Sequence, residues 1–473
     1  MKSLFFALCL SAGALFPLSA SDAPIGKIAD DSSLRISVKD SWLTETPERA
    51  LAKRPVIHRL PGGGKVELRA EAGGDEFMVI LARELTGGAG GAGTAAGFPG
   101  WAQGSWILTR RRDTGAAARI RVFLRSDPYV YVQFRPLYED KCRMDVVLYD
   151  AYIVRSLPLP VPFERLYTMP VEDALKLAGD KFPRRYFDVD PADYRDERLL
   201  ISRIRKFLPG LNFADDGAID ENGNYVYINT LAPQSAPGIP QGTPPQRDAW
   251  RPPREPAEAA PGLNCSGFVK WLVDGILRPF TGKRLSIGPL KAPFGERGSS
   301  FTDPWEERRD PFFGLDWNRN LASRAALTLR SPAYAAPEEI EVRAEPFSQL
   351  VIRGKNTVSI RNYPGFLENA GYGIEGLKPL LYTLSVDDPG KIYLAAVNNE
   401  TGPASTPDNP RGAPRLRQYF HVAVLIPYFN EYGGFRIAVF ESAAETSFNA
   451  FQSRYPAHYV NLVRVPLETR FDP

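Results

Sequence analysis

Proline and glycine are the residues that most constrain how this chain can fold. Its 473 residues include 43 prolines and 40 glycines. A proline inside a helix costs about 3 kcal/mol, because it removes a backbone hydrogen bond and clashes with the preceding turn. This frequency favours short strands, turns and long loops over a helical bundle. Hydrophobic residues still make up 44% of the chain, which excludes a wholly disordered or collagen-like protein.

The charges of the chain are nearly balanced. Lys and Arg number 58 and Asp and Glu number 55, which leaves a formal net charge of +3 at pH 7. Proteins that bind nucleic acids through the phosphate backbone carry a basic face or a clear basic excess. We therefore expect no nucleic-acid partner.

Residues 1–20 have the three parts of a cleaved signal peptide. Lys2 provides the positive start, an apolar stretch covers 4–18, and small residues follow at 19–21. Such a stretch is short for a membrane span, and a buried N-terminal strand is the alternative. No later segment reaches about 18 uninterrupted apolar residues. We therefore expect an extracytoplasmic protein, periplasmic or secreted, with no integral membrane segment after signal cleavage.

The chain after this leader divides into two parts. Over 24–165, short segments rich in β-branched and aromatic residues alternate with Gly, Pro or Asp clusters, which predicts an antiparallel β-rich accessory domain. The predicted strands of this part are 33–38, 65–70, 77–82, 105–108, 120–124, 129–134 and 144–154.

The second part, 166–473, combines helical and strand patterns. Segments 171–178 and 197–208 have helical spacing, and a Pro-rich loop at 232–262 follows them. Further strands are predicted at 349–352, 357–360, 391–397, 421–426, 434–440 and 459–465. The sequence therefore predicts an α+β protein.

The run Gly73-Gly74-Asp75-Glu76-Phe77 spells the GGDEF signature of diguanylate cyclases. Nothing else in the chain supports that activity, since a cyclase needs metal-binding carboxylates well upstream and GTP, which is absent outside the cytoplasm. A short motif without its structural context is a weak indication. We interpret the run as a Gly-Gly turn between two strands.

Cys265 emerges from the Pro-rich loop at the start of a helix. Apolar residues recur at i, i+4 spacing from Phe268 to Leu277, which predicts an amphipathic helix of about three turns that ends near 278–279. Asn264 is a good N-cap residue. A thiol in the first turn lies at the positive end of the helix dipole, beside backbone N–H groups that favour a thiolate and can stabilise a carbonyl oxyanion. The small residues Ser266 and Gly267 would let a substrate backbone approach closely.

The segment Asn264-Cys265-Ser266-Gly267-Phe268-Val269 resembles the nucleophile motif of the NlpC family of papain-like cysteine peptidases, in which Asp-Cys-Ser-Gly, an apolar residue and Val open a helix. Asn264 stands where that family usually has Asp. The resemblance implies a papain-like, NlpC-type catalytic domain within 166–473, with Cys265 as its nucleophile. The long separation between Cys265 and the next motif implies a large insertion at about 282–388.

A cysteine nucleophile needs a base, and the chain has three histidines, His58, His421 and His458. His421 opens the apolar run 421–426, which resembles the family's second motif, a histidine at the start of a strand. The Pro-Gly turn and strand at 388–394 also resemble the segment before that motif. His421 is therefore the expected general base, with a satisfied core histidine as the alternative. We expect His58 on a surface strand and His458 in a structural role or as a second candidate base.

Glu441 is the expected partner of His421. A hairpin symmetric about Glu431 would place Glu441 directly opposite His421, within reach of its ring. The carboxylate would fix the tautomer, so that the other ring nitrogen faces Cys265. A slip of one residue would turn Glu441 to the other face, and Ser442 and Glu445 are then the alternatives.

The family also tends to place a tyrosine upstream of the cysteine as an oxyanion donor, and Tyr225 and Tyr227 are the candidates here. We carry Tyr227 and Ser266 forward as oxyanion or substrate residues. After loss of Cys9 with the leader, Cys142 and Cys265 remain, and in an oxidising compartment they could form a disulfide. Charged neighbours and the absence of a helix start predict instead that Cys142 is a free or incidental thiol.

These features predict a secreted cysteine hydrolase that cleaves amide bonds by a Cys-His-Glu acyl-enzyme mechanism. The resemblance implies peptidoglycan stem peptides as the substrate. No metal or other cofactor is expected, because His and Cys are too few and too scattered for a ligand set. The alternative is a non-catalytic secreted β-rich protein that binds glycan or another envelope component, with Cys265 packed in a core or paired with Cys142.

Overall fold

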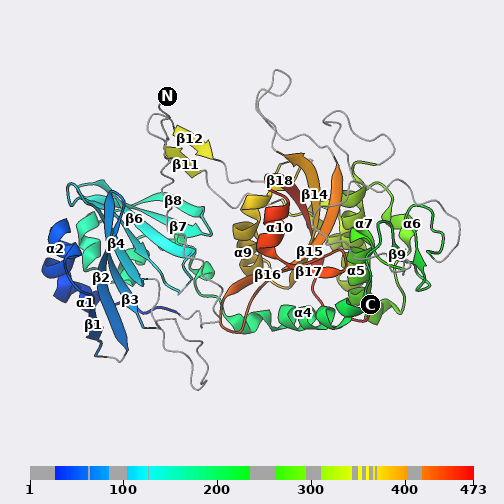
Figure 1. Cartoon of the computed structure of the whole chain (residues 1–473), viewed down its shortest axis with the longest axis horizontal. Coiled ribbons are helices and arrows are strands. Elements are labelled where there is room, and N and C mark those ends of the chain that lie inside the picture. Colours follow the sequence, from blue (N-terminus) through cyan, green and yellow to red (C-terminus); the bar gives the residue numbers. More distant parts are fainter. Residues whose placement is uncertain are drawn as a thin grey trace, which may run out of the picture.

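The computed structural model describes residues 27–61, 64–84, 104–125, 127–234, 261–294, 310–343, 350–353, 358–361, 366–367, 370–401 and 418–473. The predicted signal peptide at 1–20 and most of the Pro-rich loop at 232–262 lie outside these residues. The described residues form a mixed α+β protein with an eight-stranded sheet and a six-stranded sheet. Figure 1 shows the two sheets in separate halves of the molecule, each with its own helices.

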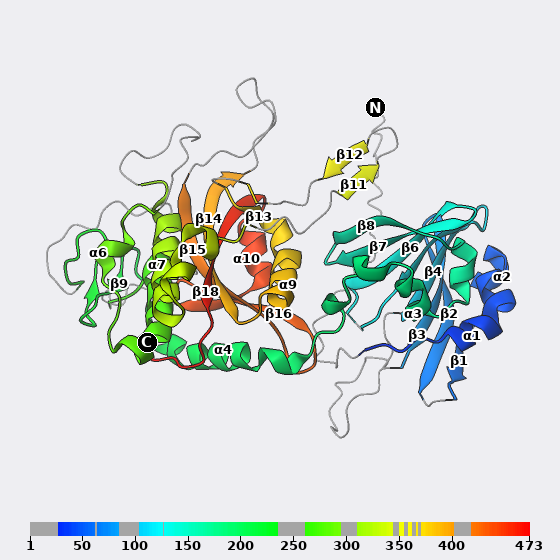
Figure 2. The ribbon, with the colours of Figure 1, turned by 180° about the vertical axis from the view of Figure 1, so that it is seen from behind.

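The eight-stranded sheet is antiparallel, and each strand pairs with the next along the chain. Its strands are β1 (Val56–Arg59), β2 (Lys65–Gly73), β3 (Glu76–Arg83), β4 (Trp106–Arg111), β5 (Ala117–Val122), β6 (Val130–Tyr138), β7 (Lys141–Leu148) and β8 (Ala151–Leu159). Alternate side chains of these strands enter one hydrophobic core. Three short helices accompany this sheet, and Figure 2 shows them: α1 (Ser32–Val38), α2 (Pro47–Leu51) and α3 (Val171–Lys176).

The structure confirms most of the strands predicted in this part and corrects two of them. The predicted strand at 33–38 is wrong, because these residues form α1 and bury Leu34, Arg35 and Val38 at helical spacing. The single strand predicted at 144–154 is two strands, β7 and β8. They are joined at Tyr149 and Asp150, whose φ angles are 47° and 66°. No glycine marks this tight hairpin in the sequence, so the usual signal was absent.

The GGDEF run is the hairpin turn predicted from the sequence. Gly73 pairs with Glu76 across β2 and β3, and Gly74 has φ of +59°. A positive φ is the conformation that glycine adopts without strain.

The six-stranded sheet lies in the C-terminal half, with strand order β13-β18-β14-β15-β16-β17. Its strands are β13 (Tyr372–Gly373), β14 (Lys391–Thr401), β15 (Tyr419–Phe429), β16 (Phe435–Glu441), β17 (Ala444–Ser447) and β18 (His458–Pro466). Two small antiparallel pairs are separate from it: β9 (Ala218–Ile219) with β10 (Tyr225–Val226), and β11 (Leu350–Arg353) with β12 (Val358–Arg361). The strands predicted in this part are therefore confirmed; β15 extends beyond its predicted bounds at both ends, whereas β16 keeps the predicted length and is shifted by one residue.

Helices cover both faces of this sheet. The helices of this half are α4 (Arg195–Phe207), α5 (Cys265–Thr281), α6 (Ile287–Leu290), α7 (Phe313–Leu329), α8 (Pro337–Ile340), α9 (Leu377–Asp387) and α10 (Phe448–Arg454). Residues of α5 and α7 share one core with one face of the sheet, whereas α9 and α10 contribute to the core on the other face. In Figure 1, the sheet accordingly stands between α9 and α10 on one side and α5 and α7 on the other. The segment expected as an insertion, about 282–388, thus supplies α7, which packs directly on α5.

Helix α5 continues beyond its predicted end near 278–279 and stops at Thr281. Pro279 lies inside the helix and has no N–H for the carbonyl of Gly275. That carbonyl accepts a hydrogen bond of 2.8 Å from the backbone N–H of Asp472. The C-terminal segment therefore satisfies the group that the proline leaves open, and Gly282, with φ of +72°, ends the helix.

Aromatic side chains and Arg125 take part in the contact between the two halves. The ring of Tyr149 lies 5.7 Å from that of Tyr382 on α9 and 5.8 Å from that of Phe435 on β16. Arg125, which is 3% exposed, donates hydrogen bonds of 2.9 Å to the carbonyl of Val189 and 3.1 Å to the carbonyl of Gly433. The segment that follows β5 is thereby hydrogen-bonded to the turn between β15 and β16.

Candidate active site

Cys265 is the first residue of α5, as the sequence predicts. The preceding Asn264 has extended backbone angles, and its side-chain oxygen accepts a 2.8 Å hydrogen bond from the N–H of Gly267. This cap uses one of the free N–H groups of the first turn and leaves those of Cys265 and Ser266 without a partner inside the helix. Cys265 is half-buried, so its sulfur lies at the edge of the core, beside the positive end of a helix.

The small residues after the cysteine serve the packing of α5. A Cβ atom on Gly267 would lie 1.9 Å from the carbonyl oxygen of Gly217, and the N–H of Asn264 bonds to the same oxygen at 3.0 Å. Ser266 is 4% exposed, and its carbonyl accepts a 2.9 Å bond from the indole N–H of Trp317 on α7. The close approach expected of a substrate at Gly267 is therefore made by the chain's own backbone at Gly217.

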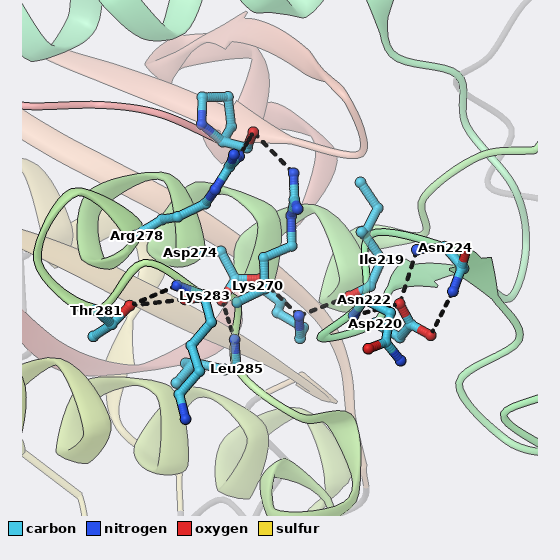
Figure 3. Close-up of polar contacts among 12 residues, drawn as sticks. Ile219, Asp220, Asn222, Asn224, Lys270, Asp274, Arg278, Thr281, Lys283 and Leu285 are labelled. Atoms are coloured by element: carbon cyan, nitrogen blue, oxygen red, sulfur yellow. Dashed lines mark hydrogen bonds and ion pairs between the residues drawn. The ribbon is translucent and has the colours of Figure 1, made fainter.

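A buried ion pair anchors the same helix further along. Figure 3 shows Lys270 and Asp274 on successive turns of α5, with 2.6 Å between Nζ and Oδ2 and side chains only 1% exposed. The ammonium also donates to the carbonyl of Ile219 on β9 at 2.7 Å, and Oδ1 of Asp274 accepts from the N–H of Leu285 at 2.9 Å. The pair thus ties the β9–β10 hairpin and the segment after α5 to the helix that carries Cys265.

His421 lies near the start of β15, and Glu441 ends β16. The Nε2 atom of His421 is 2.7 Å from Oε2 of Glu441, and the two residues are 5% and 1% exposed. This is the contact expected from the sequence, although the expected register is wrong. Val424 pairs with Phe440, so the hairpin is centred one residue later than Glu431, and Glu441 is a diagonal neighbour of His421. The residue opposite His421 thus differs by two positions from the expected one. Because side chains alternate between the two faces of a strand, a difference of two leaves His421 and Glu441 on the same face.

The sulfur of Cys265 and the imidazole of His421 interact directly. Because Nε2 is bonded to Glu441, Nδ1 is the ring nitrogen left for the hydrogen bond with Sγ. Burial of the thiol would raise its pKa, but hydrogen bonding and charge from His421 and a hydrogen bond from the N–H of Val422 hold that pKa below its ordinary value of 9.0. Burial would likewise lower the pKa of His421, but its contacts with Cys265 and Glu441 raise that pKa from 6.5 to about 10. Both shifts favour a thiolate beside an imidazolium over a neutral thiol beside a neutral imidazole.

Arg454 completes the arrangement, although no sequence pattern singles it out. It is the last residue of α10, and its guanidinium bonds to Oε1 of Glu441, the oxygen that His421 does not use. Burial would raise the pKa of Glu441, but His421 and Arg454 together lower it, so the carboxylate stays ionised. A buried carboxylate needs a counter-charge, so a cation near Glu441 could be expected. The sequence does not indicate which residue supplies that cation.

The other candidate residues lie apart from this contact. His58 is on β1, and His458, at the start of β18, bonds through Nδ1 to the carbonyl of Pro456. Glu445 forms a two-pronged pair with Arg205 on α4, with both distances 2.8 Å. Ser442 lies in the turn between β16 and β17.

Tyr227 follows β10 on the hairpin that packs against the first turn of α5. Its backbone bonds to Ala232 and Leu231 hold it in the turn after that strand. Its role as an oxyanion donor stays a prediction.

Cys142 and Cys265 are both free thiols in the structure. Cys142 is free, as predicted, but its thiol is buried in the core of the eight-stranded sheet instead of lying among charges. Burial raises its pKa to about 11. Cys142 is therefore a packing residue of β7. Its thiol pKa is raised, whereas that of Cys265 is lowered.

No group of three or more His, Cys, Asp or Glu side chains among the described residues is arranged to hold a metal ion. No helix among the same residues has the length and apolar character needed to cross a bilayer.

Comparison with known proteins identifies one domain. Residues 24–186 match a domain of unknown function (DUF8515), which includes the eight-stranded sheet and α3. No curated protein and no solved structure matches the chain. The match covers about a third of the chain and ends before Cys265.

Proposed function

We propose that this chain is a cysteine hydrolase that cleaves amide bonds through a thioester intermediate. One observation carries the proposal: a half-buried cysteine at a helix N-terminus meets a buried histidine, whose other nitrogen is 2.7 Å from the carboxylate of Glu441. A nucleophile, a base and a residue that orients the base, in mutual hydrogen-bond contact, are the parts that acyl transfer requires.

The first half of the reaction forms a thioester. The thiolate of Cys265 attacks the carbonyl carbon of the scissile amide, and the carbonyl oxygen becomes an oxyanion. The backbone N–H groups at the start of α5 are the donors available to this oxyanion. As the tetrahedral intermediate collapses, the imidazolium of His421 gives its proton to the amine that leaves, and the thioester remains on Cys265.

The second half releases the acid. Neutral His421 takes a proton from a water molecule, whose oxygen attacks the thioester carbonyl, and the thiolate then leaves with the proton kept on His421. Glu441 stabilises the imidazolium and holds the ring in one tautomer, with Nδ1 toward the sulfur.

We further propose a papain-like, NlpC-type catalytic domain within 166–473 and peptidoglycan stem peptides as its substrate. The support is the resemblance of the motif around Cys265 and of the histidine strand at His421. The predicted export leader supports an extracytoplasmic site of action, where the wall is accessible. The first domain, which holds the eight-stranded sheet, would then be an accessory to this enzyme.

Digestion of purified sacculi tests the proposal. The protein and its Cys265→Ala variant are incubated with sacculi, and mass analysis identifies the soluble fragments. We expect new peptide termini with the unaltered protein and none with the variant. Binding to sacculi without any new terminus, by both proteins alike, would favour the non-catalytic envelope binder instead.

A further inference from the structure

Arg454 bonds to the same carboxylate as the candidate catalytic histidine. The two oxygens of Glu441 are divided between two cations: Oε2 contacts Nε2 of His421 and Oε1 contacts the Arg454 guanidinium. The side chains are 1% exposed for Glu441, 6% for His421 and 13% for Arg454. Water therefore screens these charges little, and the charge state of each group depends on the charges of the other two.

The balance of charge changes with the protonation of Cys265. When the sulfur is a thiol, His421 and Arg454 carry two positive charges against the single negative charge of Glu441. Transfer of the thiol proton out of the site leaves two anions and two cations, a neutral set. Without Arg454, the set is already neutral with a protonated sulfur, and ionising Cys265 would create an uncompensated negative charge in a poorly solvated place.

We propose that Arg454 is a positioning residue that keeps the Cys265 nucleophile ionised, by neutralising Glu441 from the side opposite His421. This inference rests on the proposed role of Cys265 as the nucleophile. Among the contacts of Arg454, the one to Glu441 is the contact that this inference uses. Arg454 acts through Glu441, whose carboxylate it holds in place for His421.

The position of Arg454 is built into the fold. Ser447 caps α10 by accepting a 3.1 Å bond from the N–H of Ala450, and this short helix ends at Arg454. The next residue, Tyr455, is buried, and its ring lies 5.4 Å from that of His421 and 5.6 Å from the guanidinium carbon of Arg454. Adjacent residues of one helix end therefore contact both members of the His421–Glu441 pair.

The neighbouring titratable groups do not replace Arg454. His458 lies against the rings of Phe420 and Tyr455 and bonds to a backbone carbonyl. Glu445, on β17, is paired with Arg205 from α4. On α5, Ser266 is the side chain that hydrogen-bonds to the sulfur of Cys265, and it carries no charge. The cations that act on Glu441 are thus His421 and Arg454.

Titration of the Cys265 thiolate by its ultraviolet absorbance tests the inference without any substrate. We expect Arg454→Met to raise the apparent pKa of Cys265 by about one unit or more, the size of shift that a nearby opposite charge produces. Arg454→Lys keeps the charge and should shift the pKa less. The matched control is Arg205→Met, which removes an arginine from the neighbouring carboxylate of Glu445 and should leave the Cys265 titration unchanged.

Arg454→Gln, which keeps a polar group beside Glu441 but loses the charge, takes the place of Arg454→Met if the latter does not fold. A second background shows whether Arg454 acts through Glu441. In the Glu441→Gln variant the carboxylate that Arg454 neutralises is absent, so addition of the Arg454 substitution should shift the Cys265 pKa much less than it does in the wild type. The inference is overturned if removal of the Arg454 charge leaves the wild-type pKa unchanged, or raises the pKa equally in both backgrounds.

The outcomes for the inference and for the proposed function are distinct. A wild-type thiol with an ordinary or raised pKa contradicts the proposed hydrolase itself. A depressed wild-type pKa that is insensitive to Arg454 contradicts only the role of this arginine.

Discussion

Four side chains from four elements form one continuous line of contacts: Cys265 on α5, His421 on β15, Glu441 on β16 and Arg454 on α10. Each contact has a separate consequence. The helix terminus and His421 favour the thiolate, Glu441 fixes the histidine tautomer, and Arg454 keeps Glu441 ionised. At the scale of single residues, the proposed chemistry therefore depends on the carboxylate as much as on the sulfur.

Replacement of Glu441 by Gln tests this dependence. The amide keeps the shape of the side chain but loses the charge that stabilises the imidazolium and selects its tautomer. We expect kcat/KM for peptide hydrolysis to fall by about 10²- to 10⁴-fold, the range that positioned acid–base catalysis contributes. Steady-state kinetics provide the measurement.

The matched control for that variant is Glu445→Gln. Glu445 is a glutamate of the next strand that pairs with Arg205 and does not contact His421. It should keep the wild-type kcat/KM. Equal losses in both variants, or none in Glu441→Gln, would refute the role of Glu441.

The sequence predicted Cys265, His421 and Glu441 because each stands at the start or end of an element with a readable pattern. It did not predict Arg454. This residue ends the short helix α10, and the number of residues between such a helix and the strand it contacts is not fixed. The register of the β15–β16 hairpin was also not predictable, because the turn around Tyr432 admits more than one centre. Glu441 was nevertheless predicted correctly as the partner of His421, because the error in the register was an even number of residues and kept both side chains on the same face.

At the scale of elements, α5 is held by contacts that its sequence pattern does not reveal. The amphipathic spacing predicts a helix with one buried face, yet Lys270 and Asp274 are almost fully buried as well. Desolvation lowers the pKa of Lys270 and raises that of Asp274, and the attraction between the two opposes both changes. The extension of α5 past Pro279 likewise depends on Asp472, a residue remote in sequence.

Loss of Lys270 should therefore destabilise the C-terminal half. Lys270→Met leaves the carboxylate of Asp274 buried without a cation, and removal of one partner of a buried pair costs about 3–5 kcal/mol. The midpoint of urea unfolding, followed by circular dichroism, measures this loss. The double variant Lys270→Met/Asp274→Leu should recover part of it.

Lys176→Met is the comparison variant for that experiment. Lys176 forms a similar helical ion pair with Asp173, at 2.9 Å, but both side chains are exposed. Exposed pairs contribute little to stability, so its unfolding midpoint should stay at the wild-type value. If Lys270→Met behaved like Lys176→Met, the buried pair would not be what anchors α5.

At the scale of the whole molecule, the eight-stranded sheet and the six-stranded sheet contact each other through Tyr149, Tyr382, Phe435 and Arg125. The strand patterns predicted both sheets, because alternating apolar residues mark a half-buried strand wherever it lies. The contact between the halves was not predicted, since it joins residues that are each ordinary members of their own element. Arg125 in particular donates to main-chain carbonyls, which any sequence supplies.

Arg125→Met should uncouple the two halves. Its buried guanidinium belongs to the first part and bonds to the carbonyls of Val189 and Gly433 in the second, and an unsatisfied buried polar group costs about 1–3 kcal/mol. We expect scanning calorimetry to show one unfolding transition for the wild type and a broadened or divided one for the variant. Arg112→Met, at the exposed turn beside Gly74, is the control and should retain the single transition.

The rate at which iodoacetamide alkylates Cys265, measured against pH for the wild type and His421→Ala, tests the central claim most directly. The account predicts fast labelling of the wild type at neutral pH, with a midpoint well below the ordinary thiol pKa of 9.0, and absent from Cys265→Ala. Buried Cys142, whose pKa is raised to about 11, should not contribute at neutral pH. His421→Ala should shift the midpoint upward by about one unit or more and slow labelling at pH 7 by about tenfold or more. The same profile in both proteins would show that the sulfur and the imidazole do not act together.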